Sequence, residues 1–382
     1  MDPSIGEQSS VDREHSGAER HIAVKPLLRD ILFTLVVFLG FLCCLEGLAL
    51  LGRELVPGFA GTAGKNPRFQ PNAHYRSHPY FGLEPNPASA GGKAVVNRHG
   101  LQGTEIPASK ETANEFRIFC LGGSTSEALP VDQFELELSR LHPTRRLRVQ
   151  NAATGTYSTA ESLLVYLFKI AYLQPDLLLV YHAVNDVYPA AFYRERFSDY
   201  RQYRKVWNEA LPRFPKWYMD LFDHSALVHL FHDRVFRSLH HLWEYTLHPT
   251  DLPPREAMVI VESPGFGTWY KRNLERLILA AKSDAVRVVL ITFVIDPDFP
   301  SPLWHLAIAK MNTILRDLAA NHEVALFDLA ALFEHQRPKE NLFEDYCHFN
   351  SAGERWRLQA LVDFFREARN KEPQLIPERA SP

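Results

Sequence analysis

Short runs that are apolar at nearly every position recur along this chain, and they restrict its fold more than any other feature. One run reads DLLLVYH over 176–182, and another reads VRVVLITF over 286–293. A strand with one face in water alternates apolar and polar residues, whereas these runs are apolar on both faces. They therefore predict parallel strands that are covered by helices on both sides.

Predicted helices separate these strands. The pattern gives further strands over 116–121, 147–151 and 324–329, and helices over 124–140, 158–173, 270–283, 302–321 and 351–367. Strands and helices that alternate through short connections predict a doubly wound α/β fold with a mostly parallel sheet of about five strands. Such sheets bind ligands at the carboxyl ends of their strands.

The composition fits a globular protein with a hydrophobic core. Of the 382 residues, 46% are hydrophobic and 23% are charged, and the formal net charge is −3. Because the charge is near neutral and no basic stripe dominates, we expect no nucleic-acid partner. The cysteines have the spacing of neither a zinc site nor a disulfide framework, so they do not identify the compartment; they are Cys43, Cys44, Cys120 and Cys347.

An N-terminal apolar segment, Ile31 to Leu51, is long enough to cross a bilayer, which takes about 20 apolar residues. A signal peptide usually has a shorter apolar core and a small-residue cleavage site, and Gly-Arg-Glu-Leu-Val-Pro follows here instead. Glu46 within the segment favours the alternative, a buried core helix. More basic residues precede the segment than follow it, so the positive-inside rule places the N-terminus in the cytoplasm.

These patterns divide the chain into five segments. In chain order we expect a disordered cytoplasmic tail (1–26), a single-pass transmembrane helix (27–52), a linker with an irregular leading segment (53–114), a folded domain with a helical insertion at about 190–255 (115–370), and a disordered tail (371–382). The helix would anchor the chain in the inner or plasma membrane. The folded domain would be extracytoplasmic, which means periplasmic in a Gram-negative cell.

The segment Gly122-Gly123-Ser124 joins a predicted strand to a predicted helix. The two glycines allow a sharp turn, and Ser124 would begin the helix. There the helix dipole and free backbone N–H groups favour a developing anion. A phosphate-binding loop and an ordinary helix cap are alternative interpretations of the same residues.

Two other polar groups follow predicted strands. Asp345 precedes His348 by three residues, so its carboxylate could fix the imidazole tautomer while His348 acts as a general base. The Asn185 side-chain amide could stabilise an oxyanion, or Asn185 and Asp186 could form a turn. Together with Ser124, these residues supply the hydroxyl, the base and the orienting carboxylate of a serine-nucleophile site.

The combined pattern resembles the SGNH hydrolase family, which comprises the GDSL-type esterases and lipases. The matching segments are Gly122–Thr125 for the first block, Ala183–Asp186 for the third block with Ala in place of Gly, and Asp345–His348 for the fifth block, followed by Phe349–Gly353. Asn97–Glu105 resembles a segment that precedes the first block in membrane-anchored bacterial members. The resemblance covers about residues 75–370. It implies a three-layer α/β/α sandwich of the SGNH or flavodoxin-like type.

The resemblance also implies site residues. Ser124 would be the nucleophile, His348 its general base and Asp345 the residue that orients the base. The enzyme would cleave an acyl ester, or transfer the acyl group to another hydroxyl, with neither a metal nor an organic cofactor. Its expected extracytoplasmic location makes O-acetyl groups on cell-envelope glycans a plausible substrate.

The implied oxyanion hole combines the Ser124 N–H, the Asn185 side chain and one backbone N–H from the second block. In that block the sequence NAATGTYS offers Gly155, while another alignment places Thr156 at the family's glycine. Both residues remain candidates, because any backbone N–H can serve. Loss of one such donor typically costs about 2.7–4 kcal/mol.

Two other functions fit part of the pattern. A catalytically silent domain of the same fold could be a membrane-tethered binding or assembly component of envelope polysaccharide synthesis, and the irregular second block and Ala183 leave room for this role. A nucleotide-binding protein could use 122–126 for phosphate. The chain lacks the P-loop lysine for this, and nucleotide binding gives no reason for the Asp345–His348 motif.

The stretch 188–254 is rich in aromatic, arginine and histidine residues. We expect amphipathic helices there, which could form a lid, a surface facing the membrane or an ordinary insertion. No Cys or His-Glu-x-x-His signature accompanies its histidines, so no metal site is expected. Cys347 adjoins His348 but is not expected to be the nucleophile.

Overall fold

A computed structural model describes residues 15–55, 75–78, 80–87, 95–203, 225–227, 252–336, 338 and 340–378. Most of the predicted insertion, part of the predicted linker and leading segment, and the end of the predicted C-terminal tail lie outside these residues. The chain divides into two compact units. One comprises residues 1–65 and 217–240, and the other comprises 66–216 and 241–382.

The first unit contains α1 (His15–Leu55). Within it, Leu27–Gly52 is long and apolar enough to cross a membrane, with a mean hydropathy of 2.5. Among the helices that the structure describes, it is the one that meets this criterion. Its apolar window is not buried, which disfavours the alternative of a core helix. Because α1 begins at His15, part of the segment expected to be a disordered tail is helical.

Glu46 is the one acidic residue of the apolar run Ile31 to Leu51, and its carboxylate contacts a distant chain segment in the same unit. It accepts hydrogen bonds from the Ser225 hydroxyl (2.6 Å) and from the N–H groups of Ala226 (2.5 Å) and Leu227 (3.0 Å). Three donors on one carboxylate offset the cost of placing it on an apolar helix. The contact also joins the predicted insertion to α1.

The second unit is built on a five-stranded parallel sheet with the order β4-β3-β5-β6-β7. Its strands are β3 (Glu115–Gly122), β4 (Arg146–Asn151), β5 (Leu177–Tyr181), β6 (Arg287–Ile291) and β7 (Ala325–Phe327). Every residue of β3 and β5 is buried, as expected for strands covered on both faces. The predicted doubly wound parallel sheet is therefore confirmed.

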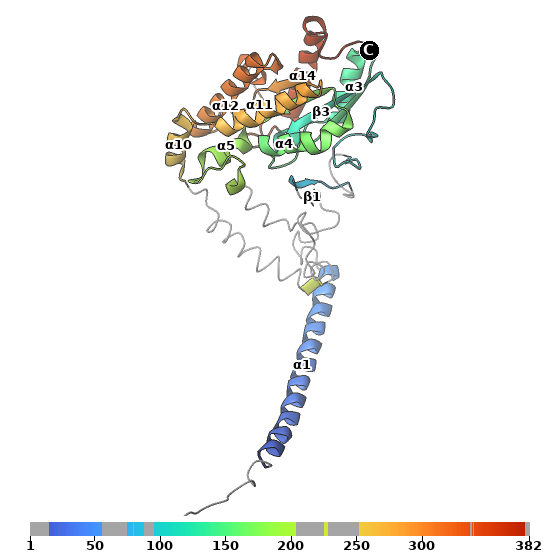
Figure 1. Cartoon of the computed structure of the whole chain (residues 1–382), viewed down its shortest axis with the longest axis vertical. Helices are drawn as coiled ribbons and strands as arrows, with labels where there is room; N and C mark the ends of the chain where they lie inside the picture. The colour runs from blue at the N-terminus through green and yellow to red at the C-terminus, as the bar shows by residue number, and fades with distance from the viewer. Residues whose placement is uncertain are drawn as a thin grey trace, which may run out of the picture. The chain divides into compact units, whose positions relative to one another are not determined.

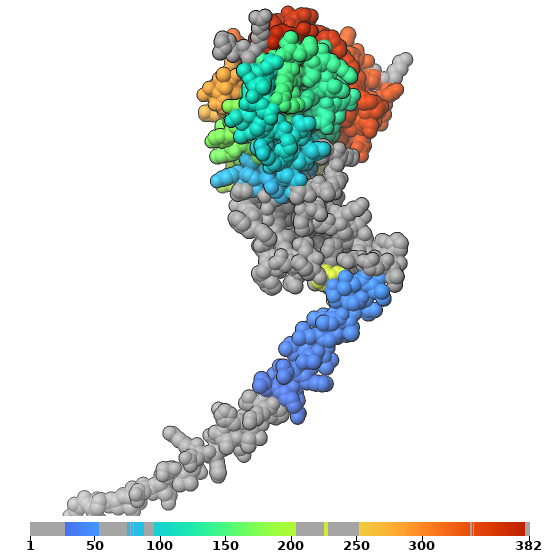
Figure 2. Space-filling model, turned by 90° about the vertical axis from the view of Figure 1, so that its right-hand side faces the viewer, coloured from blue at the N-terminus to red at the C-terminus, as the bar shows by residue number. Residues whose placement is uncertain are grey.

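Helices cover both faces of the sheet and form a three-layer sandwich (Figure 1). The main ones are α3 (Val131–Leu141) and α14 (Ser351–Lys371) on one face, and α4 (Thr159–Val165), α11 (Thr268–Ser283) and α12 (Pro302–Asn321) on the other. Three shorter helices are α5 (Val184–Ala191), α10 (Pro254–Glu262) and α13 (Leu329–Gln336). In the space-filling view, the green and orange-to-red parts of this unit pack as one body (Figure 2).

Two predicted helices are divided in the structure. The helix expected over 124–140 consists of α2 (Ser124–Glu127) and α3, because Pro130 lies between them and has no N–H to continue the first helix. The helix expected over 158–173 is α4 followed by a π-helix, η2 (Tyr166–Ile170), and a 3₁₀ turn, η3 (Ala171–Leu173).

The leading segment, expected to be irregular, contains an antiparallel hairpin of β1 (Tyr75–His78) and β2 (Gly82–Pro85). The Tyr157 hydroxyl, which belongs to the loop after β4, donates a hydrogen bond to the Leu83 carbonyl. The hairpin is thereby attached to the sheet unit next to that loop.

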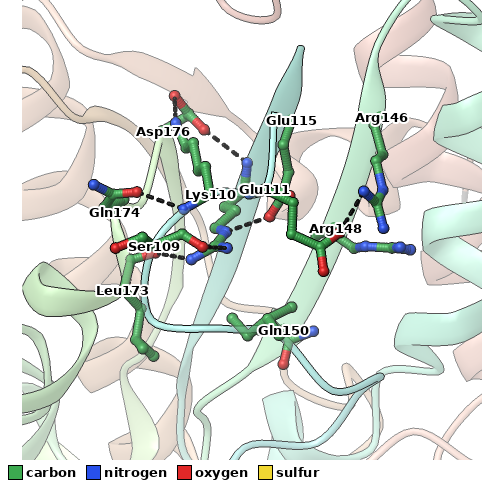
Figure 3. Close-up of polar contacts among 12 residues, drawn as sticks. Ser109, Lys110, Glu111, Glu115, Arg146, Arg148, Gln150, Leu173, Gln174 and Asp176 are labelled. Carbon is green, nitrogen blue, oxygen red and sulfur yellow. Dashed lines mark hydrogen bonds and ion pairs between the residues drawn. The ribbon is translucent and has the colours of Figure 1, made fainter. Parts of the chain in front are cut away.

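A buried polar network fixes the amino-terminal part of the sheet (Figure 3). Arg117 of β3 is fully buried, and its Nε donates to Glu115 at 2.6 Å. The rest of the guanidinium donates to three backbone carbonyls, those of Ala108, Ser109 and Leu173. Beside it, Lys110 pairs with Asp176 at 2.7 Å. The network ties the leading segment to the amino-terminal end of β3. The carboxyl ends of the strands, where the site forms, lie at the opposite edge of the sheet.

Candidate active site

The residues predicted to form the site lie at the point where the sheet's connections diverge. The connection after β3 leads to β4 on one side, and the connection after β4 returns to β5 on the other side of β3. Ser124 begins α2 directly after β3, and Asn185 lies in the first turn of α5 after β5. Both side chains thus occupy the crevice where doubly wound sheets bind ligands.

The turn between β3 and α2 needs both of its glycines. A Cβ on Gly122 would collide with the Ser126 side chain, and a Cβ on Gly123 would collide with the Asn185 amide. The turn therefore presents Ser124 close to Asn185. As the first residue of its helix, Ser124 also has a backbone N–H without an intrahelical acceptor.

The structure brings Ser124, His348 and Asp345 into one chain of hydrogen bonds. The Ser124 Oγ lies 2.8 Å from His348 Nε2, and His348 Nδ1 lies 2.8 Å from Asp345 Oδ2. The other carboxylate oxygen of Asp345 accepts the N–H groups of Cys347 and His348, each at 2.8 Å. The loop that carries His348 is thus folded around the Asp345 side chain.

The environment of Asp345 keeps it ionised. Partial burial acts to raise its pKa, but the two backbone N–H groups and the His348 imidazole outweigh this effect and hold the pKa below the ordinary value. A carboxylate that stays charged can keep the proton of His348 on Nδ1, which leaves Nε2 free to accept a proton from Ser124.

The two candidates for the second backbone donor differ in their contacts. The Gly155 N–H donates to Glu127 Oε2 at 2.8 Å, so it is already engaged. Thr156 has the left-handed backbone conformation, with φ 71°, which costs a β-branched residue about 1–2 kcal/mol. Within the described part of the chain, its N–H has no hydrogen-bond acceptor. Asn185 donates one amide proton to the Tyr157 carbonyl (2.8 Å), which leaves its other amide proton available.

A pocket of about 170 Å³ opens beside these groups. It is lined by Gly123, Ser124, Asn185, His348 and an aromatic wall that includes Tyr188, Phe293 and Tyr346. The Tyr188 and Tyr346 hydroxyls lie 3.1 Å apart. A cavity of about 150 Å³ is enough for a benzene-sized molecule, so this pocket can hold a small acyl group.

A family model of GDSL-like lipases and acylhydrolases matches residues 120–356, from the strand before Ser124 to the helix after His348. The chain belongs to this family. The resemblance seen in the sequence is thereby confirmed, and the protein is a hydrolase acting on ester bonds.

No curated protein sequence matches this GDSL-like acylhydrolase. Similar solved structures include the acetyl xylan esterase AlAXEase (15% identity, 65% of this chain and 99% of that chain, TM-score 0.40). Others are the lipase/acylhydrolase from Enterococcus faecalis (16%, 66% and 96%, TM-score 0.39) and Axe2, an acetylxylan esterase from Geobacillus stearothermophilus (14%, 67% and 96%, TM-score 0.39).

Arg357 of α14 is a residue of the acylhydrolase that sequence reasoning missed. It is buried, and its guanidinium donates to the Thr125 carbonyl at 2.7 Å and pairs with Glu354. The cation also lies over the Tyr181 ring, 5.5 Å from its centroid. Arg357 thus joins the helix that follows the His348 loop to the turn that carries Ser124. No motif in the sequence signals this contact.

One group of possible metal ligands occurs among the described residues of the acylhydrolase, namely Asp345, Cys347 and His348. Burial and then the Asp345 charge raise the pKa of the Cys347 thiol well above its ordinary value, so the thiol stays protonated. A protonated thiol is a poor metal ligand. Asp345 and His348 are paired with each other, so these residues fit proton transfer better than metal binding.

Proposed function

We propose that this acylhydrolase is a membrane-anchored serine esterase in which Ser124, His348 and Asp345 form the catalytic triad. The observation that carries the proposal is the unbroken chain of hydrogen bonds from Asp345 through His348 to Ser124, at the mouth of a small pocket. Such a chain is what activation of a serine hydroxyl requires.

In the proposed reaction, His348 Nε2 takes the proton of Ser124 while Oγ attacks the ester carbonyl carbon. The carbonyl oxygen becomes an oxyanion. When the tetrahedral intermediate collapses, His348 gives the proton to the departing alcohol, and an acyl-serine remains. A water molecule then repeats the two steps and releases the acid. A second hydroxyl compound in place of water would receive the acyl group, which makes the enzyme a transferase.

Three donors would hold the oxyanion. The Ser124 N–H lies at the start of α2, and the second amide proton of Asn185 is available. For the third donor we favour the Thr156 N–H over that of Gly155, because the Gly155 N–H is bound to Glu127. Preorganised donors of this kind contribute about 2.7–4 kcal/mol each.

The pocket volume supports a short acyl group, such as acetyl, as the group that is cleaved. For the alcohol part we propose an O-acylated cell-envelope glycan. The support is the expected topology, with residues 1–26 in the cytoplasm, 27–52 in the inner membrane and the domain over 115–370 outside the cytoplasm.

The test is hydrolysis of p-nitrophenyl acetate by the full-length chain in detergent, beside Ser124→Ala. The proposal predicts that Ser124→Ala lowers kcat by about 10⁴-fold or more while circular dichroism and thermal unfolding stay unchanged. Equal turnover in the two proteins would rule out the serine mechanism. No turnover in either protein on this donor or on acetylated oligosaccharides would favour a silent binding domain instead.

A further inference from the structure

Glu127 stands out because its carboxylate joins three parts of the chain next to the proposed nucleophile. It is the last residue of α2, the helix that Ser124 begins. Its oxygens accept the Tyr75 hydroxyl at 2.7 Å and the Gly155 N–H at 2.8 Å. The mechanism above gives this carboxylate no role, although it lies one helical turn from Ser124.

The loop that Glu127 holds is fixed at several other points along its backbone. Asn151 donates to the Ser126 carbonyl at 2.9 Å, and the Thr154 N–H donates to the Gly122 carbonyl at 3.2 Å. These contacts hold the first half of the loop against the β3–α2 turn. Glu127 adds a contact to Gly155, the residue immediately before Thr156, whose backbone is left-handed.

Tyr75 completes the arrangement from outside the sheet. It lies at the start of β1, in the hairpin that precedes the family match. Burial and then the Glu127 charge raise the pKa of Tyr75 well above its ordinary value, so the hydroxyl keeps its proton and donates it to the carboxylate. A Cβ on Gly155 would lie 3.2 Å from the Tyr75 hydroxyl, so the three groups are packed closely.

We infer that Glu127 is a positioning residue for the oxyanion hole, and that Tyr75 of the leading hairpin supports it. By engaging the Gly155 N–H, Glu127 fixes the peptide group between Thr154 and Gly155, and so it holds Gly155 in place directly before the peptide group that carries the Thr156 N–H. The Thr156 N–H is then the donor left for the substrate. The inference rests on the proposed function, since an oxyanion must form for the donor to matter.

The test uses the full-length chain in detergent with p-nitrophenyl acetate and separates kcat from KM. Glu127→Ala frees Gly155, and with it the adjoining peptide group that carries the Thr156 N–H, so kcat should fall about 10²-fold or more, the effect of losing one oxyanion donor. KM should change little, because the oxyanion exists only after attack. Tyr75→Phe removes one support and should lower kcat by a smaller factor.

Glu127→Gln is the conservative variant. Its carbonyl oxygen can still accept the Gly155 N–H, and its amide can donate to the Tyr75 oxygen, so most of the kcat should return. The matched control is Glu135→Ala. Glu135 likewise accepts a backbone N–H, that of Val149 in β4, at 2.7 Å, and its removal should lower stability but leave kcat unchanged.

Ser124→Ala distinguishes a failure of the Glu127 inference from a failure of the proposed function. If Ser124→Ala is inactive and folded Glu127→Ala keeps the original kcat, the inference is wrong and the proposed function stands. If Ser124→Ala stays active, the proposed function itself fails. Should Glu127→Ala not fold, Tyr75→Phe and Glu127→Gln decide: an unchanged kcat in folded Tyr75→Phe, or a kcat in Glu127→Gln below that of Tyr75→Phe, overturns the inference.

Discussion

At the scale of single residues, Gly123 offers a sharp test of the Asn185 amide. A methyl group on Gly123 would displace that amide from the turn, so Gly123→Ala should lower kcat for p-nitrophenyl acetate by about 10²–10³-fold. Gly265→Ala is the control, because a Cβ at Gly265 meets open space, and it should keep full activity. A folded Gly123→Ala protein with the original kcat would argue against Asn185 as an oxyanion donor.

Asp186 follows Asn185 in α5, and its burial should make the stability of the fold depend on pH. Burial raises its pKa from 3.8 to about 7, although hydrogen bonds from Thr159 oppose the shift. Between these pH values the folded chain keeps a proton that the unfolded chain releases. The free energy of unfolding should therefore fall as the pH rises from about 4 to about 7, and this contribution should be constant above that range.

Urea unfolding at several pH values checks this prediction. Asp186→Asn should remove the fall between pH 4 and 7, whereas Asp132→Asn, at an exposed position on α3, should keep it. An unchanged pH dependence in Asp186→Asn would mean that another group carries the effect.

The residues of the site were predictable to different degrees. Ser124, Asp345 and His348 each follow a recognisable strand or motif, and the structure places them in hydrogen-bond contact. Their catalytic roles remain predictions. Glu127 and Arg357 could not be assigned from the sequence, because their contacts join segments that only the folded sheet brings together.

At the scale of elements, the buried pair of Arg117 and Glu115 should hold β3 in place. Arg117→Met leaves the Glu115 carboxylate buried without its cation, so we expect a loss of about 3–5 kcal/mol in the free energy of unfolding. Denaturant unfolding measures this loss. Arg140→Met, which breaks an exposed pair with Glu137, should cost less than about 1 kcal/mol. Equal losses in the two variants would contradict the role of the buried network.

The strands and long helices were predictable because periodicity reports burial directly. The predicted bounds of α12 agree with the structure, and those of β3 and β5 differ by a single residue at each end. The departures have local causes. Pro130 divides the first predicted helix. The π-helix over Tyr166–Ile170 depends on tertiary packing that a helical pattern does not record. The β1–β2 hairpin was missed because its strands are short.

At the scale of the whole molecule, the fold class followed from the alternation of strands and helices. The membrane anchor remains a proposal that fractionation can test. The full-length chain should sediment with membranes and resist alkaline carbonate, and removal of residues 1–55 should release the protein into the soluble fraction. Intact mass provides the control: a mature chain that begins after residue 52 would identify a cleaved signal sequence.

The contact between Glu46 and Ser225–Leu227 also has a consequence in time. A ribosome completes α1 long before it reaches residue 225, so the Glu46 carboxylate is made without the three donors that it has in the finished protein. Until they arrive, other hydrogen-bond donors must solvate it. The contact of α1 through Glu46 therefore forms only after a part of the chain that is synthesised about 180 residues later.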